Sequence, residues 1–386
     1  MGQPTIVIVG AGFGGWQTAV SLARRQISCL LLDRHGEQCF IPLLFHVSVG
    51  LLAPEWIVSD LGKASQHSPY IRFQKAAVVK VSLAEGYLET TAGSVTFDYL
   101  VLATGSRSRP IPAAAFPMRT LDDAIALRNH LLTHSQQAIV VVGGGATGVE
   151  LAGALAEGGL GRRIILLQSR DYLLPDLPPA LARYTLRQLQ RLGIEVRLGV
   201  RVQSVTGDRV VLDTGEEILT PTTIWTAGLE PELPEVTPFL ELSHRQRVAV
   251  LPTLQLPAYE RVYALGDLAA ARDRGTYLTG VAPEALQQGV AVARNLARQL
   301  RGRTPLPFRY FNKGRLAIIG GYGGVGQIGS LPLRGWLPWV LWLAVHLIYL
   351  PGYGNRWQVL QTWFKTYGLR LTSTPITYLT QRQERL

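Results

Sequence analysis

The chain has 386 residues, more than one hydrophobic core usually serves, so two or three domains are expected. Hydrophobic residues make up 47% and charged residues 17%, which indicates a globular protein. The net charge is +11, but the basic residues are scattered and the aromatic residues gather in one apolar tail, so nucleic acid is not an expected partner. The two cysteines form no CxxC or metal-binding pattern, so no metal site is expected.

The N-terminal residues predict a strand, a glycine-rich loop, a helix and a second strand. Residues 5–9 are apolar and β-branched, which is typical of a strand buried on both faces. The loop covers residues 10–15, the helix residues 16–25 and the second strand residues 28–33. Together they form one βαβ unit.

The loop of this unit has the glycine spacing of a dinucleotide-binding site. Gly10 permits a tight turn, Gly12 lets the backbone approach a pyrophosphate, and Gly15 allows close helix–strand packing. The helix that follows offers free N–H groups and the positive end of its dipole to the phosphates. Asp33 ends the second strand, where a carboxylate accepts hydrogen bonds from a ribose.

A second unit of the same kind is predicted further along the chain. Residues 72–102 favour a meander of short strands, and residues 107–117, rich in proline and alanine, favour a linker. Residues 138–168 then repeat the strand–loop–helix–strand order, which indicates two related domains. The later expected elements are a helix over 180–192, strands ending near residue 228, a strand over 261–267 and a helix over 283–301.

The second glycine loop, with Gly143, Gly145 and Gly148, lacks the expected acid. Gln168 stands at the end of the second strand, and Arg170 follows closely. A carboxylate would repel the 2′-phosphate of NADPH, whereas a neutral amide with a nearby cation admits it. The sequence therefore favours NADH or NADPH as substrate; the alternative is that Arg170 points to solvent and Gln168 serves NADH.

The C-terminal region has the character of a membrane anchor. Residues 331–353 contain one formally charged side chain, and five of the eight tryptophans lie between positions 336 and 363. Prolines and glycines leave an uninterrupted helical part, residues 339–350, that is too short to span a bilayer. We expect a monotopic anchor on anionic lipid, with a second interfacial helix over residues 355–367; the alternative is a buried packing helix.

The two glycine fingerprints, the Ala103-Thr104-Gly105 segment and the Gly266-Asp267 pair resemble the two-dinucleotide flavoprotein superfamily over nearly the whole chain. The resemblance implies an α/β fold with two Rossmann-like domains of the glutathione-reductase-like kind, here followed by a membrane-anchoring helical segment. It also implies FAD as the cofactor, with the Gly-Asp pair at its ribityl and phosphate groups.

A narrower resemblance is to the type II NADH dehydrogenases, the single-subunit, non-pumping NAD(P)H:quinone oxidoreductases. In that family two glutamines four apart often lie on the quinone-site helix; Gln287 matches the second, but Pro283 stands at the first. The calcium-binding insert of some plant and fungal members has no counterpart here. Four segments carry the resemblance: residues 33–47, 143–150, 280–289 and 308–320.

The resemblance assigns three catalytic candidates, each with an ordinary alternative. Gln287 would contact the quinone carbonyl or be a plain helix residue, and Lys313 would neutralise charge near the reduced flavin or be solvated. Glu150 would lie where nicotinamide meets flavin, or would complement the helix dipole. His46 is either a proton donor or, as we favour, a core histidine. The predicted cofactor contacts are Gly10, Gly12, Phe13, Gly14, Gly15, Asp33, Arg34, Pro42, Ala103, Thr104, Gly105, Gly143, Gly145, Ala146, Thr147, Gly148, Gln168, Arg170, Gly228, Gly266, Asp267 and Ala282.

The expected function is FAD-dependent transfer of a hydride from NAD(P)H to flavin, followed by two-electron reduction of a membrane quinone without proton pumping. The quinone is of the plastoquinone, ubiquinone or menaquinone type, and a homodimer is left open. The N-terminus carries no signal peptide, so the enzyme is expected at the cytoplasmic face of a membrane, bound peripherally. The expected divisions are residues 1–110 and 251–328 for the FAD domain, 111–250 for the NAD(P)H domain and 329–386 for the anchoring tail.

Two other functions use the same motifs. One is a soluble FAD-dependent NAD(P)H reductase of a small iron–sulfur carrier, against which the tryptophan-rich tail argues. The other is a non-enzymatic, nicotinamide-sensing flavoprotein, because a fold alone does not fix a function. Sulfide:quinone oxidoreductases and disulfide reductases are disfavoured, because Cys29 and Cys39 do not form the cysteine sets that those enzymes need.

Overall fold

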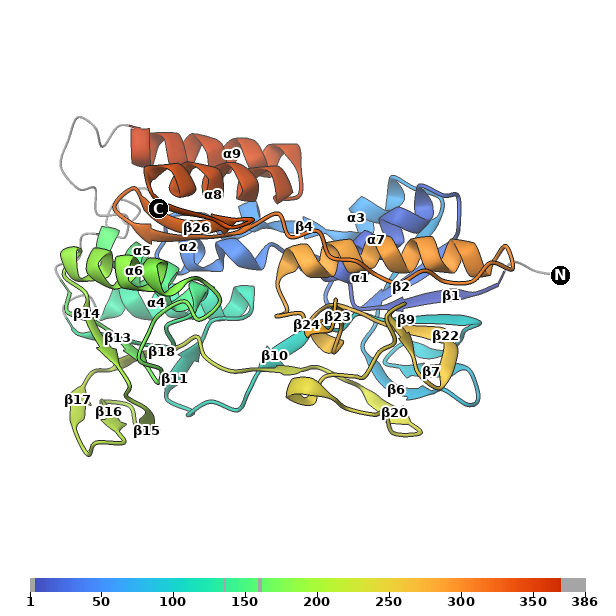
Figure 1. The fold of residues 1–386 in the computed structure, drawn as a ribbon, viewed down its shortest axis with the longest axis horizontal. Helices are drawn as coiled ribbons and strands as arrows, with labels where there is room; N and C mark the ends of the chain where they lie inside the picture. The colour runs from blue at the N-terminus through green and yellow to red at the C-terminus, as the bar shows by residue number, and fades with distance from the viewer. Residues whose placement is uncertain (1–3, 135–136, 159–161, 369–386) are drawn as a thin grey trace. The chain divides into compact units, whose positions relative to one another are not determined.

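The computed structural model describes residues 4–134, 137–158 and 162–368, and the chain divides into two units (Figure 1). The first unit takes its residues from 1–38, 59–107 and 229–311, and the second from 39–58, 108–228 and 312–386. Both units are therefore assembled from segments far apart in the sequence. The expected domain boundaries concern which cofactor each part binds, and they stay predictions.

A six-stranded sheet with the order β21-β22-β9-β1-β2-β5 forms the centre of the first unit. All neighbours pair in parallel except β21, which is antiparallel to β22. The central strand β1 is buried on both faces: Ile6 and Ile8 join one hydrophobic cluster, and Val7 and Val9 join the other. The strands are β1 (Ile6–Val9), β2 (Cys29–Asp33), β5 (Ile71–Lys75), β9 (Tyr99–Leu102), β21 (Gln255–Leu256) and β22 (Tyr259–Ala264).

Helices cover one face of this sheet and a second, smaller sheet covers the other. Helix α1 (Phe13–Ala23) packs against α7 (Ala282–Gln299), and α1 begins three residues earlier than predicted because the last residues of the glycine loop are already helical. The short helix α3 (Leu61–Gln66) lies beside β5. The smaller sheet has the order β20-β6-β7-β8, with β6 (Val78–Ser82), β7 (Tyr87–Thr90), β8 (Gly93–Thr96) and β20 (Glu235–Thr237). A further hairpin joins β23 (Arg272–Asp273) and β24 (Thr276–Tyr277).

The second unit is built on a five-stranded parallel sheet with the order β11-β18-β12-β13-β14. The predicted linker is wrong at its end, because residues 115–117 form β11 at the edge of this sheet, where a proline costs no ladder hydrogen bond. The strands are β11 (Ala115–Pro117), β12 (Ile139–Val142), β13 (Ile164–Gln168), β14 (Glu195–Leu198) and β18 (Thr222–Trp225), and the helices are α4 (Leu121–Thr133), α5 (Ala146–Glu157) and α6 (Pro179–Arg191).

Two antiparallel sheets and short connecting strands complete the strands of the described residues. One sheet is β15 (Val202–Val205), β16 (Arg209–Leu212) and β17 (Glu217–Leu219); the other is β25 (Arg315–Gly320), β26 (Gly323–Ile328) and β27 (Leu331–Gly335). The short strands β3 (Glu37–Cys39), β4 (Val58–Asp60), β10 (Ser106–Ser108) and β19 (Leu229–Pro231) lie where the chain passes between the units.

Of two helices near the C-terminus, the first lies on the β25–β27 sheet of the second unit and the second lies beside the first (Figure 1). Helix α8 (Trp336–Tyr349) begins three residues before its predicted start, because Pro338 lies in its first turn, where a missing N–H loses no helical bond. Helix α9 (Tyr353–Trp363) continues into a π-helical turn, Phe364–Gly368. No helix among the described residues is long and apolar enough to cross a membrane. The short helix α2 (Leu44–Ser48) belongs to the same unit.

The glycine contacts of the first unit predict a stability difference between two alanine substitutions. A Cβ at Gly15 would lie 1.8 Å from the Gly10 carbonyl oxygen, whereas a Cβ at Gly12 would meet no atom within 4 Å. We expect Gly15→Ala to destabilise the chain by about 1–3 kcal/mol and Gly12→Ala by much less. Thermal unfolding of the two variants measures this, and equal melting temperatures would refute the contact.

Candidate functional site

The first glycine loop forms a backbone cradle at the end of β1. Gly10 has φ +98°, and any Cβ there would lie 2.4 Å from the Ala103 carbonyl oxygen at the end of β9. Gly15 lies against Gly10, so the start of α1 is held close to the strand. The space beside Gly12 is open, and Phe13 and Gly14 begin the helix. The free N–H groups of α1 therefore face a space that a pyrophosphate can enter.

Asp33 is fixed beside this cradle by two backbone hydrogen bonds. Its carboxylate oxygens accept from the Ala11 N–H at 2.6 Å and from the His35 N–H at 2.7 Å. Both oxygens retain acceptor capacity, which suits a ribose diol. The neighbouring Arg34 forms a two-point ion pair with Glu232, at 2.5 and 3.0 Å.

The predicted Gly-Asp pair is held by partners from distant segments. The Gly266 N–H donates to the buried side-chain oxygen of Gln288 at 2.6 Å, and Asp267 accepts from the Ser106 hydroxyl at 2.6 Å. The Thr104 hydroxyl donates to the Glu232 carbonyl, and Gly105 follows it in the same connection. The structure thus brings Gly266, Asp267 and residues 103–105 into the same unit as the first cradle.

Two buried charged residues that the sequence analysis missed hold the start of α7. Arg247 donates to the carbonyls of Leu278 at 3.0 Å and Thr279 at 2.9 Å. Glu284 accepts from the Gly280 N–H at 2.8 Å. They fix the loop that leads into Ala282, the first residue of α7. A glutamate in the first turn of a predicted helix was an available signal for Glu284, but no local pattern indicated Arg247.

Gln287 is engaged with the backbone of one residue. Its amide nitrogen donates to the Phe311 carbonyl at 2.9 Å, and its amide oxygen accepts from the Phe311 N–H at 2.9 Å. It therefore fixes the end of the last segment of the first unit. One hydrogen of its NH₂ group remains for another acceptor.

The residues of the first unit fit FAD. An open glycine backbone at a helix N-terminus suits its pyrophosphate, and Asp33 suits the ribose of its adenosine half. Pro42 was also predicted as a cofactor contact. It lies in a short 3₁₀-helix, Ile41–Leu43, whose residues belong to the second unit.

The second glycine loop repeats the geometry of the first. Gly143 has φ +116°, a Cβ at Gly148 would lie 1.8 Å from the Gly143 carbonyl oxygen, and the space beside Gly145 is open. Ala146 and Thr147 begin α5, so its free N–H groups border this open space. Thr226 packs on Gly143, and Gly228 follows two residues later at the end of the second unit's segment.

Gln168 and Arg170 lie at the end of β13, beside this second cradle. The buried Gln168 amide accepts from the Gly144 N–H at 3.2 Å and donates to the Tyr172 carbonyl at 3.1 Å. Arg170 is exposed, and it donates to the Tyr172 hydroxyl at 3.4 Å with its guanidinium 6.0 Å from the ring. The site therefore has a neutral amide at its base and a cation at its rim.

Glu150 is a buried acid in the second turn of α5. Burial raises the pKa of its carboxyl to about 8, although the Ile318 N–H, 3.4 Å away, and the Trp342 side chain oppose the shift by hydrogen bonding. Glu150 therefore keeps its proton at neutral pH. Trp342 belongs to α8, so this helix contacts a residue of α5 within the second unit.

A cluster of histidine and tryptophan rings surrounds Trp342. His46 is buried 5.8 Å from Trp342 and 5.9 Å from Trp363, ring centre to ring centre. Burial, with the charge of His346, lowers the pKa of His46 to about 3, so it is neutral at pH 7. This favours the core-histidine interpretation, but its Nδ1 has no hydrogen-bond partner in the described part of the chain.

Lys313 is exposed and lies beside α8. Its ammonium group donates to the Tyr349 hydroxyl at 3.2 Å. Lys313 and Glu150 belong to the second unit, whereas Gln287 belongs to the first. The three predicted catalytic residues are therefore divided between the units.

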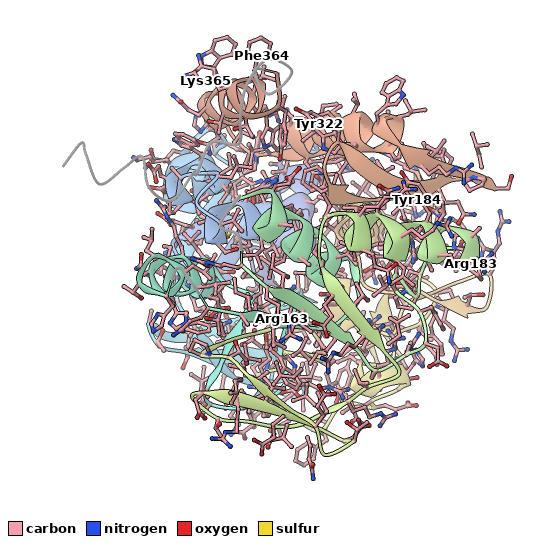
Figure 2. The ribbon with its side chains drawn as sticks, turned by 90° about the vertical axis from the view of Figure 1, so that its left-hand side faces the viewer. Arg163, Arg183, Tyr184, Tyr322, Phe364 and Lys365 are labelled. Carbon is pink, nitrogen blue, oxygen red and sulfur yellow. The ribbon has the colours of Figure 1, made fainter. Side chains whose placement is uncertain are left out.

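The outer sides of α8 and α9 expose large apolar side chains. Trp336 is 68% exposed and Phe364 69% exposed, and Figure 2 shows Phe364 and Lys365 projecting outward at the end of α9. From position 331 to 368 the chain has two arginines, one lysine and no acid. The other exposed apolar side chains of the two helices are Leu337, Val340, Val345, Ile348, Tyr349, Tyr353, Trp357 and Leu360, and Leu331 of β27 is exposed as well.

Comparisons with known proteins agree with this architecture. A family model described as pyridine nucleotide-disulphide oxidoreductase matches residues 4–289. The type II NADH:quinone oxidoreductase Ndh of Mycobacterium tuberculosis is 29% identical, over 94% of this chain and 88% of that protein. The alternative NAD(P)H-ubiquinone oxidoreductase C1 of Arabidopsis thaliana, chloroplastic/mitochondrial, is 27% identical, over 94% of this chain and 80% of that protein.

A solved structure shares the fold. NDH2 from Plasmodium falciparum, in complex with NADH, matches with a TM-score of 0.84 at 17% identity, covering 95% of this chain and 99% of that one. The α/β fold class predicted from the sequence is confirmed, and so is the resemblance to type II NADH dehydrogenases. The roles of individual residues stay predictions.

The buried Glu150 predicts a pH-dependent stability. The carboxyl ionises near 4.5 when unfolded and at about 8 when folded, so between these values the folded chain holds one more proton. Stability therefore falls as the pH rises through this range, by up to about 1.4 kcal/mol per pH unit.

Glu150→Gln removes this dependence, and melting temperatures of both proteins from pH 5 to about 8 test it. We expect the melting temperature of the variant to increase relative to that of the parent chain as the pH rises. Parallel curves would mean that the carboxyl titrates near its ordinary pKa.

Proposed function

The chain belongs to the pyridine nucleotide-disulphide oxidoreductase family, and we propose that it is an FAD-dependent NAD(P)H:quinone oxidoreductase of the type II kind. The observation that carries this is the extent of its similarity to a type II NADH:quinone oxidoreductase, which covers 94% of the chain. The similarity is therefore not confined to the nucleotide-binding residues, 4–289, that the wider family shares.

The first unit holds FAD in this proposal. The N–H groups at the start of α1 bind the pyrophosphate over Gly12, and Asp33 accepts hydrogen bonds from the ribose. Arg247 and Glu284 keep the start of α7 in place, so that Ala282 and the Gly266-Asp267 pair present a fixed surface to the cofactor. The chemistry that FAD supplies when bound is the transfer of two electrons from the nicotinamide to the quinone.

The second unit holds the nicotinamide nucleotide. The N–H groups at the start of α5 bind its pyrophosphate over Gly145. Gln168 brings no negative charge to the ribose, and Arg170 supplies a cation at the rim, so NADPH is accepted as well as NADH. Glu150, which keeps its proton at neutral pH, is assigned to the nicotinamide end of this site.

Two further residues are assigned to quinone reduction. The remaining N–H of Gln287 donates to the quinone carbonyl, while its bonds to Phe311 hold the amide in one orientation. Lys313 supplies a positive charge that offsets negative charge on the reduced cofactor, and its bond to Tyr349 restrains it. Both assignments rest on the family resemblance as well as on these contacts.

The acceptor dissolves in a bilayer, so the enzyme must reach one. The exposed aromatic side chains of α8 and α9, with cations and no acids among them, suit an anionic membrane surface. We assign the enzyme to the cytoplasmic face of that membrane as a peripheral protein. The apolar face then inserts only to the depth of the headgroups and upper acyl chains.

The first prediction of this proposal separates membrane binding from chemistry. Trp336→Ser and Phe364→Ser each remove an exposed apolar side chain, so each should weaken binding to lipid vesicles by about tenfold, which is 1.4 kcal/mol. NADH oxidation with a short-chain, water-soluble quinone should be unchanged. Flavin-loaded protein that never turns over with any quinone would overturn the proposed function.

The second prediction concerns the choice of nicotinamide nucleotide. Gln168→Glu places a carboxylate beside the ribose, so kcat/KM for NADPH should fall by at least about tenfold relative to NADH. Gln168→Asn is the matched neutral control, because it keeps an amide and adds no charge. If kcat/KM falls equally for NADH and NADPH in the glutamate variant, Gln168 does not govern access of the 2′-phosphate.

A further inference from the structure

Helices α8 and α9 form a groove that has one charged residue in an apolar wall. The groove has a volume of about 250 Å³. Five of its six lining residues are aliphatic or aromatic, and the sixth is an arginine: Leu347, Ile348, Tyr353, Arg356, Trp357 and Leu360. It lies among the exposed apolar side chains of these helices, and none of the residues assigned to the nucleotides or the quinone line it.

The arginine is held in a fixed position with part of its guanidinium free. Its Nε donates to the Leu350 carbonyl at 2.7 Å, and the guanidinium lies 5.3 Å from the centre of the Tyr353 ring. Arg356 is only partly exposed, and none of the described residues offers it a carboxylate. Among the residues that the structure describes, the Nη groups of Arg356 are therefore donors with no anionic partner.

Two side chains of the apolar wall are largely exposed to water, which is unfavourable for apolar groups. Ile348 is 64% exposed and Trp357 59% exposed, although both line a groove. Covering such surface is favourable by roughly 25 cal/mol per Å², and an acyl chain supplies hydrocarbon that can cover it. The groove therefore combines a surface for a hydrocarbon chain with a donor for a phosphate.

We propose that this groove binds one phospholipid with an anionic headgroup, its acyl chain along Ile348, Trp357 and Leu360 and its phosphate on the Nη groups of Arg356. The inference rests on the proposed membrane docking and adds a defined lipid to it. A net negative headgroup is favoured, because the cationic choline of a neutral phospholipid would lie beside the guanidinium. Apolar walls exclude free inorganic phosphate as the main ligand.

Trp357 provides the probe, since bromine atoms on an acyl chain quench a tryptophan that they touch. Vesicles contain phosphatidylcholine with a minor fraction of phosphatidylglycerol, and bromine is carried either by the phosphatidylglycerol or by an equal amount of phosphatidylcholine. The signal of Trp357 is the difference between the full-length chain and Trp357→Phe. We expect stronger quenching from brominated phosphatidylglycerol.

Two variants distinguish a lipid site from general attraction to a charged surface. Arg356→Gln should abolish the difference between the two brominated lipids. Lys365→Gln removes an equal charge outside the groove, so it should weaken vesicle binding by about fivefold and leave that difference intact. Arg356→Lys keeps the charge and should restore part of the difference, provided that its melting temperature matches the parent chain.

Each other result counts against the lipid site. Quenching that is unaffected by Arg356→Gln, or lost equally in Lys365→Gln, would leave only diffuse electrostatic attraction. Displacement of the brominated lipid by a long-chain quinone at low mole fraction would identify the groove as a quinone site instead. Failure of the parent chain to bind any vesicle would overturn the proposed membrane docking and this inference together.

Discussion

The contact of a glycine Cα with a carbonyl oxygen determines the geometry of both nucleotide sites. Gly15 lies on the Gly10 carbonyl, and Gly148 lies on the Gly143 carbonyl, each too close to accept a methyl group. Because of this contact a helix can start immediately at the end of a buried strand. The unpaired N–H groups at the start of each helix then border the open space beside Gly12 in one site and Gly145 in the other. The rest of each unit keeps that strand and helix in register.

The sequence predicted those features that depend on neighbouring residues. The buried strands, both glycine loops and the main helices follow from hydrophobic pattern and glycine spacing, and errors of three residues occur at the starts of α1 and α8. These starts were missed because glycine and proline are tolerated in a first turn. The edge strand Ala115–Pro117 was missed for a related reason, since proline is compatible with an edge.

Features that depend on distant residues could not be predicted from local pattern. Arg247 acts on carbonyls more than 30 positions away, and Glu232 receives Thr104 and Arg34 from two other segments. Gln288, to which the sequence analysis gave no role, accepts from Gly266. A helix places adjacent residues on different sides, and only the packing of α7 against α1 decides which side faces the site.

Because the first unit is built from separate segments of the chain, its parts are synthesised at widely different times. Helix α7 and strand β22 complete that unit, but they are made after the long segment 108–228 of the second unit. Until α7 is synthesised, the face of α1 that carries Gly14 has no covering helix. The N-terminal strands and helix must therefore wait for about two hundred and fifty further residues, which is a long exposure of apolar surface during translation. This topology leaves that apolar surface open to aggregation until α7 has been made.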